Sequence, residues 1–224
     1  FEKEMKVQKE QSKKSWKGSY NNEDEIIWNK ISSNLEPTIF LGYEEKFIEG
    51  KIEKIIIDNT EVIDLDNKEK KVSLILNRTP FYAEGGGQVG DTGLIKNNFF
   101  TFEVIDTQKR SNNIYEHIGL LKTGNIKVNT KAKLFIDKSR RKEIAAHHSA
   151  THLLHSSLRK ILGKHVTQKG SLVSESKLRF DISHSQSIPL VTLNDIERDI
   201  NLQIINNYPV KFNTYKKDDA MEMG

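Results

Sequence analysis

Residues 139–163, SRRKEIAAHHSATHLLHSSLRKILG, separate two regions of different character. Apolar residues recur along this stretch at helical spacing, and Gly163 stands where a helix C-terminus favours glycine. The pattern predicts a helix over residues 140–162, with Ser139 as its N-terminal cap. Strand-like segments precede this helix, and a mixture of strands and helices follows it.

The region from Phe40 to Asp137 has the composition of a β-rich domain. Short runs rich in Ile, Val, Phe and Thr alternate with turn residues such as Asp58-Asn59. Several short strands at this spacing are typical of a small barrel or sandwich. The predicted strands are residues 47–57, 61–65, 71–77, 99–106, 114–120 and 127–137.

Helices are predicted on both sides of this region. Residues 1–17 predict a helix that is polar nearly all round, and residues 22–35 a short second helix. After the central helix we expect strands over residues 165–173 and 177–183, a helix over 191–207 capped by Thr192 or Asn194, a strand over 208–214 and the start of a helix at 216–224.

The sequence therefore predicts an α+β fold in three parts. Linker helices occupy residues 1–37, a small antiparallel β-barrel residues 38–137, and a two-layer α/β subdomain, incomplete at its C-terminal end, residues 138–224.

Composition excludes several classes of protein. The chain has 0 Cys, which rules out disulfides and a cysteine nucleophile. The first residues, FEKEMKVQKEQSKK, are too charged for a signal peptide, and no apolar run approaches the roughly 20 residues of a membrane span. We expect no membrane partner and a cytoplasmic location, with organelle or dual targeting of a longer parent protein left open.

The formal net charge of +4 is unevenly distributed. Around the central helix, Glu143 is the one acidic residue between Lys138 and Gly170. A basic flank of this kind suits a ligand that carries phosphates, although a solvated helix face has the same composition. The basic residues are Lys138, Arg140, Arg141, Lys142, Arg159, Lys160, Lys164 and Lys169.

Of the chain's 7 histidines, five lie in or just after the central helix. His148 and His152 are four positions apart, so both leave one helix face and could bind one Zn²⁺. His155 is the only local candidate for a third ligand, whereas His147 should point elsewhere. The metalloprotease motif H-E-x-x-H would require Glu directly after His148, and this chain has Ser149 there. Ordinary packed histidines remain an alternative to a metal site.

The segment TPFYAEGGGQVGDTG, residues 79–93, contains three consecutive glycines. Gly85, Gly87 and Gly90 match G-x-G-x-x-G, but no helix can follow the loop, so a dinucleotide site is excluded. Glycines leave the backbone uncovered and permit positive φ, which lets a ligand approach the main chain. A tight loop at a barrel rim would also explain them.

Three motifs occur together in this order: RTPFYAEGGGQVGDTG, HSATHLLH and QKGSLVSESKLRFDISH. In order and spacing they resemble the editing domain of alanyl-tRNA synthetase, to which the AlaX-type trans-editing proteins are related. The N-terminal FEKEMKVQKEQSKKSWKG is similar to the helix that links the synthetase's tRNA-recognition part to its editing part. The resemblance covers nearly the whole chain and favours a piece of the synthetase.

The resemblance implies a hydrolase that clears mischarged tRNA(Ala), with serine and glycine as the errors, by cleaving the ester to the terminal adenosine. It places zinc on His148 and His152. It places substrate near Gly85, Gly86, Gly87, Gln88 and Gln168, with Thr79 as a weaker candidate for a pocket wall. The basic flank, represented by Arg140, Arg141, Lys160, Lys164 and Lys169, would meet the acceptor end.

The resemblance also implies features that this chain lacks. The family completes its zinc site with a later C-x-x-x-H, so we expect zinc to be absent or weakly bound here. ATP would bind only in the parent's aminoacylation domain, and the rest of the synthetase chain would be a partner. No catalytic general base is assigned, because Glu84 or Asp91 would be guesses. The alternatives are a non-catalytic tRNA-binding module with a vestigial metal site and an unrelated small barrel.

Overall fold

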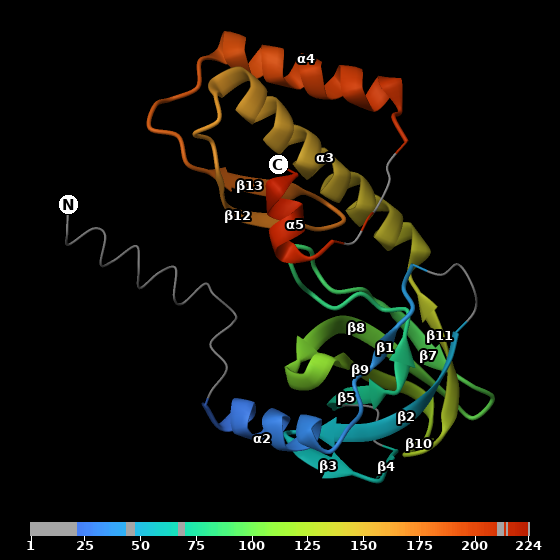
Figure 1. The fold of residues 1–224 in the computed structure, drawn as a ribbon. Helices are drawn as coiled ribbons and strands as arrows, with labels where there is room; N and C mark the ends of the chain where they lie inside the picture. Colours follow the sequence, from blue (N-terminus) through green and yellow to red (C-terminus); the bar gives the residue numbers. More distant parts are fainter. Residues whose placement is uncertain (1–21, 44–47, 67–69, 210–212, 214, 224) are drawn as a thin grey trace, which may run out of the picture.

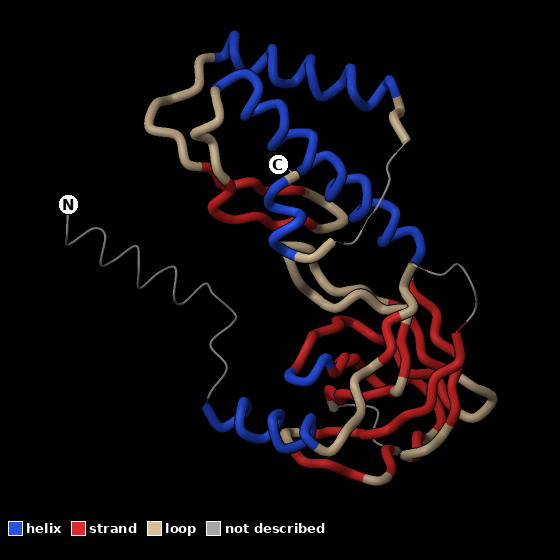
Figure 2. The backbone as a smooth tube through the Cα atoms, in the orientation of Figure 1, coloured by secondary structure: helices blue, strands red, loops and turns tan. Residues whose placement is uncertain are grey.

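The computed structural model describes residues 22–43, 48–66, 70–209, 213 and 215–223. These residues form a β-barrel, followed by helices packed on a two-stranded sheet (Figures 1 and 2). The predicted polar helix over residues 1–17 lies outside the described residues. Within the described ranges, no helix combines the length and the apolar character that a membrane crossing requires.

Six antiparallel strands close the barrel. The sheet runs in the order β11-β7-β8-β9-β5-β2, and pairing of β11 with β2 joins its two edges. Closure leaves no unpaired edge strand in the barrel wall. The strands are β2 (Ile48–Ile57), β5 (Lys71–Leu76), β7 (Gly93–Lys96), β8 (Phe100–Arg110), β9 (Ile114–Gly124) and β11 (Lys131–Ile136).

Five shorter strands among the described residues up to residue 137 lie outside the six-stranded barrel sheet. β3 (Thr60–Val62) pairs antiparallel with the end of β2. β1 (Ile39–Phe40) pairs in parallel with β6 (Arg78–Thr79), and β4 (Asp64–Leu65) pairs antiparallel with β10 (Ile126–Lys127). The barrel interior is filled by fully buried aliphatic and aromatic side chains, among them Ile52, Leu74, Ile95 and Phe102.

Helix α2 (Asn22–Ser33) covers one side of the barrel. Its Trp28 and Ile31 are buried in a cluster with barrel residues that include Ile56 and Ile114. The guanidinium carbon of Arg110, on β8, lies 4.6 Å from the centre of the Trp28 ring. Apolar burial and this cation–π contact therefore fix α2 to the barrel.

The second layer is built around α3 (Lys138–Leu162), which runs away from the barrel (Figure 1). One side of α3 packs on α4 (Leu190–Asn206), and the hairpin of β12 (Gln168–Val173) and β13 (Leu178–Ile182) packs beside it. Leu158, Val166 and Ile196 form the buried centre of this cluster. The C-terminal helix α5 comprises Lys217–Glu222.

The structure confirms the α+β class with a small barrel and changes several details. β7 was not predicted, because it is four residues long and begins at a glycine. A Cβ at Gly93 would lie 2.0 Å from the carbonyl oxygen of Phe135, so β11 passes too close for any other residue. The predicted strand 127–137 is also wrong in its first part, because Asn129, at φ +67°, interrupts it.

Two predicted helix caps are wrong. Asp137, not Ser139, caps α3, because its carboxylate accepts the Arg140 N–H at 3.0 Å. α4 starts after Pro189 with no side-chain cap, so Thr192 and Asn194 lie inside its first turns. Gly163 ends α3 with φ +116°, as predicted.

The region after α4 was only partly predicted. The expected strand over residues 208–214 is not formed at its described residues 208, 209 and 213, and residues 210–212 and 214 lie outside the described part. The C-terminal helix is confirmed as α5.

Candidate functional site

The three glycines form a tight turn that projects from the barrel. The backbones of Gly85 and Gln88 exchange two hydrogen bonds of 3.0 Å each. Between them, Gly86 and Gly87 have φ of +60° and +86°. Two successive positive φ values are the signature of a two-residue hairpin turn, which favours glycine at both positions.

This turn is seated on strand β12. The Val173 N–H donates to the carbonyl of Gly87 at 2.7 Å, and the Val89 N–H donates to the carbonyl of Val173 at 3.1 Å. A Cβ at Gly87 would lie 2.1 Å from Oγ of Ser171, whereas a Cβ at Gly86 would meet nothing within 4 Å. The close approach at Gly87 is therefore made by β12, and Gly86 is the glycine left open.

Gln88 links the turn to the histidine helix. Its Oε1 lies 2.7 Å from Nδ1 of His148, so Nδ1–H donates to the amide oxygen and Nε2 of that ring carries the lone pair. The ring of His152 stacks on His148 with centroids 5.1 Å apart and an interplanar angle of 15°. Burial, and secondarily the charge of His152, lower the pKa of His148.

The other two histidines of the cluster face different surroundings. Nδ1 of His147 lies 2.7 Å from the carbonyl oxygen of Ser174, which confirms that this ring points away from the pair. His155 packs against Phe180 with centroids 5.2 Å apart, and its Nε2 is buried without a hydrogen-bond partner.

The fit of the site to a metal can be judged from these contacts. Among the described residues, no three His, Asp or Glu side chains form a group that could hold a metal ion, and His155 packs against Phe180 instead of joining the pair as a third ligand. His148 has the arrangement of a metal-binding imidazole, because an oriented acceptor engages Nδ1 and leaves Nε2 free. His148 and His152 therefore fit two of the four positions around Zn²⁺.

Gln168 lies beside the glycine turn. Its amide donates to Oγ of Ser171 at 3.1 Å, and that hydroxyl donates to the carbonyl of Gly86 at 3.4 Å. The structure thus brings Gln168, the glycine turn, Gln88 and the histidine pair into one region. Ser171 was missed in the sequence, where a serine beside a glycine has no distinguishing signature.

Thr79 is not in this region. Its side chain is fully buried in the barrel, where Oγ1 lies 2.7 Å from Nε2 of His117 and accepts the Phe81 N–H at 3.1 Å. Burial lowers the pKa of His117 to about 4, so its ring is neutral at pH 7. Thr79 therefore meets buried barrel groups in this structure, and none of these contacts faces the histidine pair.

The candidate tRNA-binding residues divide into two groups. Arg140 and Arg141 turn inward and donate to carbonyl oxygens of the barrel segments. Lys160 is exposed and pairs with Asp199 at 2.6 Å. Lys164, between α3 and β12, and Lys169, on β12, are also exposed. Lys164 and Lys169 are thus exposed to a ligand, whereas Lys160 and the two arginines are engaged within the protein.

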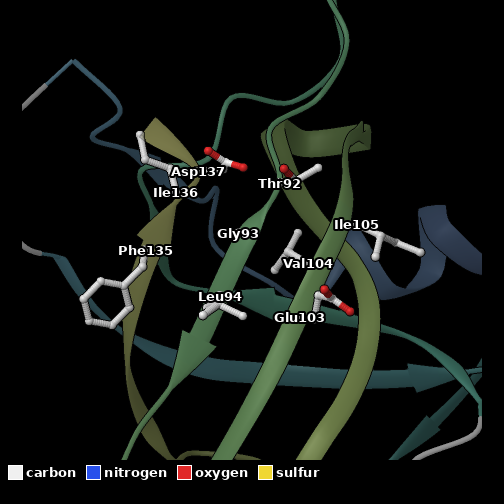
Figure 3. A pocket seen from close by; sticks show the side chains of 9 residues that line it. All are labelled: Thr92, Gly93, Leu94, Glu103, Val104, Ile105, Phe135, Ile136 and Asp137. Carbon is white, nitrogen blue, oxygen red and sulfur yellow. The ribbon is translucent and has the colours of Figure 1, made fainter. Parts of the chain in front are cut away.

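A surface hollow of about 530 Å³ lies elsewhere, against β7, β8 and β11 (Figure 3). Its lining includes the exposed apolar side chains of Ile105 and Phe135 and the acidic residues Glu103 and Asp137. No predicted site residue lines this hollow, and it contains neither of the paired histidines. The candidate site is therefore the region around the glycine turn, Gln88 and the histidine pair.

The chain is similar to known proteins over its whole length. Residues 1–140 match the family model described as tRNA synthetases class II (A). The alanine–tRNA ligase of Mesorhizobium japonicum is 40% identical over 224 residues, and that of Rickettsia felis is 43% identical over 224 residues. The alanine–tRNA ligase of Orientia tsutsugamushi is 41% identical over 229 residues. Each alignment covers 100% of this chain but only 25% or 26% of the relative, so the chain spans about a quarter of their length.

Proposed function

The chain belongs to the class II tRNA synthetase (A) family, and from that premise we propose that it is an editing domain that hydrolyses mischarged Ser-tRNA(Ala) and Gly-tRNA(Ala). The bond cleaved is the ester between the amino acid and the terminal adenosine. Serine adds one hydroxyl to alanine and glycine lacks one methyl, differences too small for a single binding step to reject. A second, hydrolytic site supplies the missing discrimination.

The observation that carries the proposal is the 2.7 Å contact between Gln88 and His148. It joins two of the motifs on which the resemblance rests, and Gln168 of the third motif reaches the same turn through Ser171. Three segments far apart in the sequence thus converge on one region. Convergence of this kind supports a shared site better than three separate structural roles.

We propose that His148 and His152 hold zinc, with further ligands from outside the described residues. Bound zinc would supply a Lewis acid and lower the pKa of bound water. Gln88 fixes the His148 ring with Nε2 directed away from the turn's amide, as an orienting partner does in metal sites. The site groups of this chain therefore orient and bind, and no general base is assigned to them.

The substrate would approach at Gly86, where no side chain covers the backbone. Gly86 is exposed and has open space where a side chain would be, so the terminal ribose can reach the main chain there. Gln168, whose side chain is also exposed, lies next to this opening and can donate or accept a hydrogen bond. We propose that Gln168 orients the aminoacyl end.

Partner binding would involve the exposed lysines. Lys164 follows α3 and Lys169 lies on β12, one residue after Gln168. Cations at these positions suit the phosphates of the tRNA acceptor end. The lysines, rather than the inward-facing Arg140 and Arg141, are therefore the proposed contacts.

Replacement of Gln168 by Ala tests the proposal, with Gln186→Ala, on the exposed loop before α4, as the matched control. The assay is hydrolysis of Ser-tRNA(Ala) by the chain extended through the C-x-x-x-H that the resemblance predicts. We expect Gln168→Ala to slow hydrolysis by about 10²-fold, the cost of a lost positioning contact, and Gln186→Ala to leave it unchanged. Equal rates for both variants would contradict the role of Gln168.

A further inference from the structure

The guanidinium of Arg141 connects three segments of the chain. Its Nε donates to Oδ1 of Asp91 at 3.2 Å, and a terminal nitrogen pairs with the other carboxylate oxygen. The same group donates to the carbonyl oxygens of Gly42 and Pro80 at 2.8 and 2.7 Å. A planar guanidinium can satisfy several acceptors at once, whereas a lysine ammonium on a flexible stem cannot reproduce this fork.

Asp91 is held from the barrel side as well. Its carboxylate accepts the Tyr82 N–H at 2.7 Å, its own N–H donates to the Tyr82 carbonyl at 2.9 Å, and the Thr107 hydroxyl donates to its carbonyl at 2.9 Å. Its side chain is only 2% exposed. A carboxylate so buried needs its cationic partner, so Arg141 is committed to Asp91.

Arg140 makes a second connection one residue earlier. It donates to the carbonyl of Gly90 at 2.8 Å and pairs with Glu175, in the β12–β13 turn, at 3.2 Å. The first turn of α3 therefore contacts the end of the glycine segment, residues 79–93, through both arginines. It also contacts the hairpin on which the glycine turn is seated.

Arg140 and Arg141 lie on the same helix as the histidine pair. Arg141 and His148 lie seven residues apart on α3, about 10 Å along the axis of a helix. Their respective partners, Asp91 and Gln88, lie three residues apart. The glycine segment is thus fastened to α3 at two separate points, one of which is the contact between Gln88 and His148.

We propose that Arg141 is a positioning residue that locks the glycine segment onto α3, and that it is not a contact to tRNA phosphates. With Asp91 anchored, Gln88 and the turn at Gly86–Gly87 have little freedom to move relative to His148 and β12. Without the ion pair between Arg141 and Asp91, the glycine turn would separate more often from β12. The consequence for hydrolysis rests on the proposed function, but the positioning itself does not.

Arg141→Lys is the most discriminating variant, because lysine keeps the charge and loses the fork. The primary measurement is amide hydrogen exchange at Val89 and Val173, whose N–H groups join the turn to β12. Exchange of the Ile52 amide, which donates to the Thr130 carbonyl in the barrel, reports global opening. We expect exchange at Val89 and Val173 to accelerate by about tenfold or more, with Ile52 little changed.

A second readout separates positioning from phosphate binding. The affinity for tRNA is measured at several salt concentrations. The logarithm of the association constant K falls linearly with the logarithm of the salt concentration, and loss of one phosphate contact makes this negative slope shallower by about one. We expect Asp91→Asn, which keeps an acceptor for the Tyr82 N–H, to accelerate the same two amides without changing this slope. Lys142→Ala, an exposed neighbour on α3, serves as the control for exchange and should leave both amides unchanged.

The proposal is overturned if Arg141→Lys leaves exchange at Val89 and Val173 unchanged. It is also overturned if all three amides accelerate equally, since that result indicates only global destabilisation. A third outcome would also overturn it. If Arg141→Gln makes the negative slope of log K for tRNA against log salt shallower by about one, and amide exchange at Val89 and Val173 is unchanged, Arg141 is a phosphate contact. None of these measurements depends on ester hydrolysis, so failure of the proposed activity is distinguishable from failure of this inference.

Discussion

Gln88 and His148 are 60 positions apart in the chain, and their side chains meet at 2.7 Å. The contact joins a turn of the barrel to the helix that carries the histidine pair. It also fixes which imidazole nitrogen is free, because Nδ1–H is used by the amide oxygen and Nε2 is not. The hydrogen bond from His148 to Gln88 thus leaves Nε2 of His148 as the nitrogen that can bind a metal ion.

The first prediction concerns the orienting amide. In the protein extended through the expected C-x-x-x-H, we expect Gln88→Ala to weaken zinc binding by about 10–100-fold, the usual cost of losing an orienting partner. Competition with a chromophoric chelator measures the affinity. The Gln186→Ala variant should bind zinc like the unmodified protein. An unchanged affinity in Gln88→Ala would show that His148 does not depend on this amide.

The second prediction compares two adjacent glycines. Gly86→Ala should cost about 1–2 kcal/mol, because only its φ of +60° is unfavourable for alanine and its Cβ meets nothing within 4 Å. Gly87→Ala should cost about 1–3 kcal/mol more, because its Cβ would lie 2.1 Å from Oγ of Ser171 and force the turn off β12. Urea unfolding of both variants measures the difference. Equal stabilities would mean that the turn is not seated on β12.

The third prediction concerns His117, whose pKa is lowered to about 4 by burial. Above pH 6.5 the ring is neutral in both the folded and the unfolded states and contributes no pH dependence. Between pH 6.5 and 4 only the unfolded state binds the proton, so the free energy of unfolding falls with falling pH by about 3 kcal/mol in total. Below pH 4 this contribution levels off.

Urea unfolding at pH 7 and pH 4 checks this sign, with His117→Gln as the comparison. The variant should be less stable at pH 7, since it disturbs the hydrogen bonds to Thr79 and to the Leu74 carbonyl. It should lose less stability than the unmodified chain on acidification, because the titrating ring is gone. Identical acid profiles would contradict the assignment to His117.

The fourth prediction tests the proposed tRNA contacts. The double replacement of Lys164 and Lys169 by Ala should make the negative slope of log K against log salt shallower by between about one and two. Lys127→Ala, on β10 at the far end of the barrel, is the control (Figure 1). A slope that changes equally in the control and the double variant would indicate diffuse charge rather than a binding face.

Local features of this structure were predictable from the sequence. Helix α3 follows from apolar spacing and a C-terminal glycine, and the histidine pair follows from a separation of four residues on that helix. The turn at Asp58-Asn59, where both residues have positive φ, was likewise recognisable from residue type. Each of these depends on neighbours only a few positions away.

Features that depend on distant partners were not predictable. Arg140 and Arg141 were assigned to tRNA from their charge, because a sequence shows the cations but not their partners. Arg141 pairs with the buried Asp91, 50 residues away. Arg140 donates to the Gly90 carbonyl and pairs with Glu175. The resemblance made Thr79 a weaker candidate for a pocket wall, and in the structure its hydroxyl meets His117 inside the barrel. The contact of Gln88 with His148 arises only once the barrel and α3 are assembled.

The most direct test of the proposed editing activity is hydrolysis of Ser-tRNA(Ala) beside Ala-tRNA(Ala) by the zinc-loaded protein extended through the expected C-x-x-x-H. We expect the serine ester to be cleaved and the alanine ester to be spared, and Gln168→Ala to cleave the serine ester about 10²-fold more slowly while still binding tRNA. A protein that binds zinc and tRNA but cleaves neither ester would contradict the proposed hydrolysis and identify the domain as a non-catalytic tRNA-binding module.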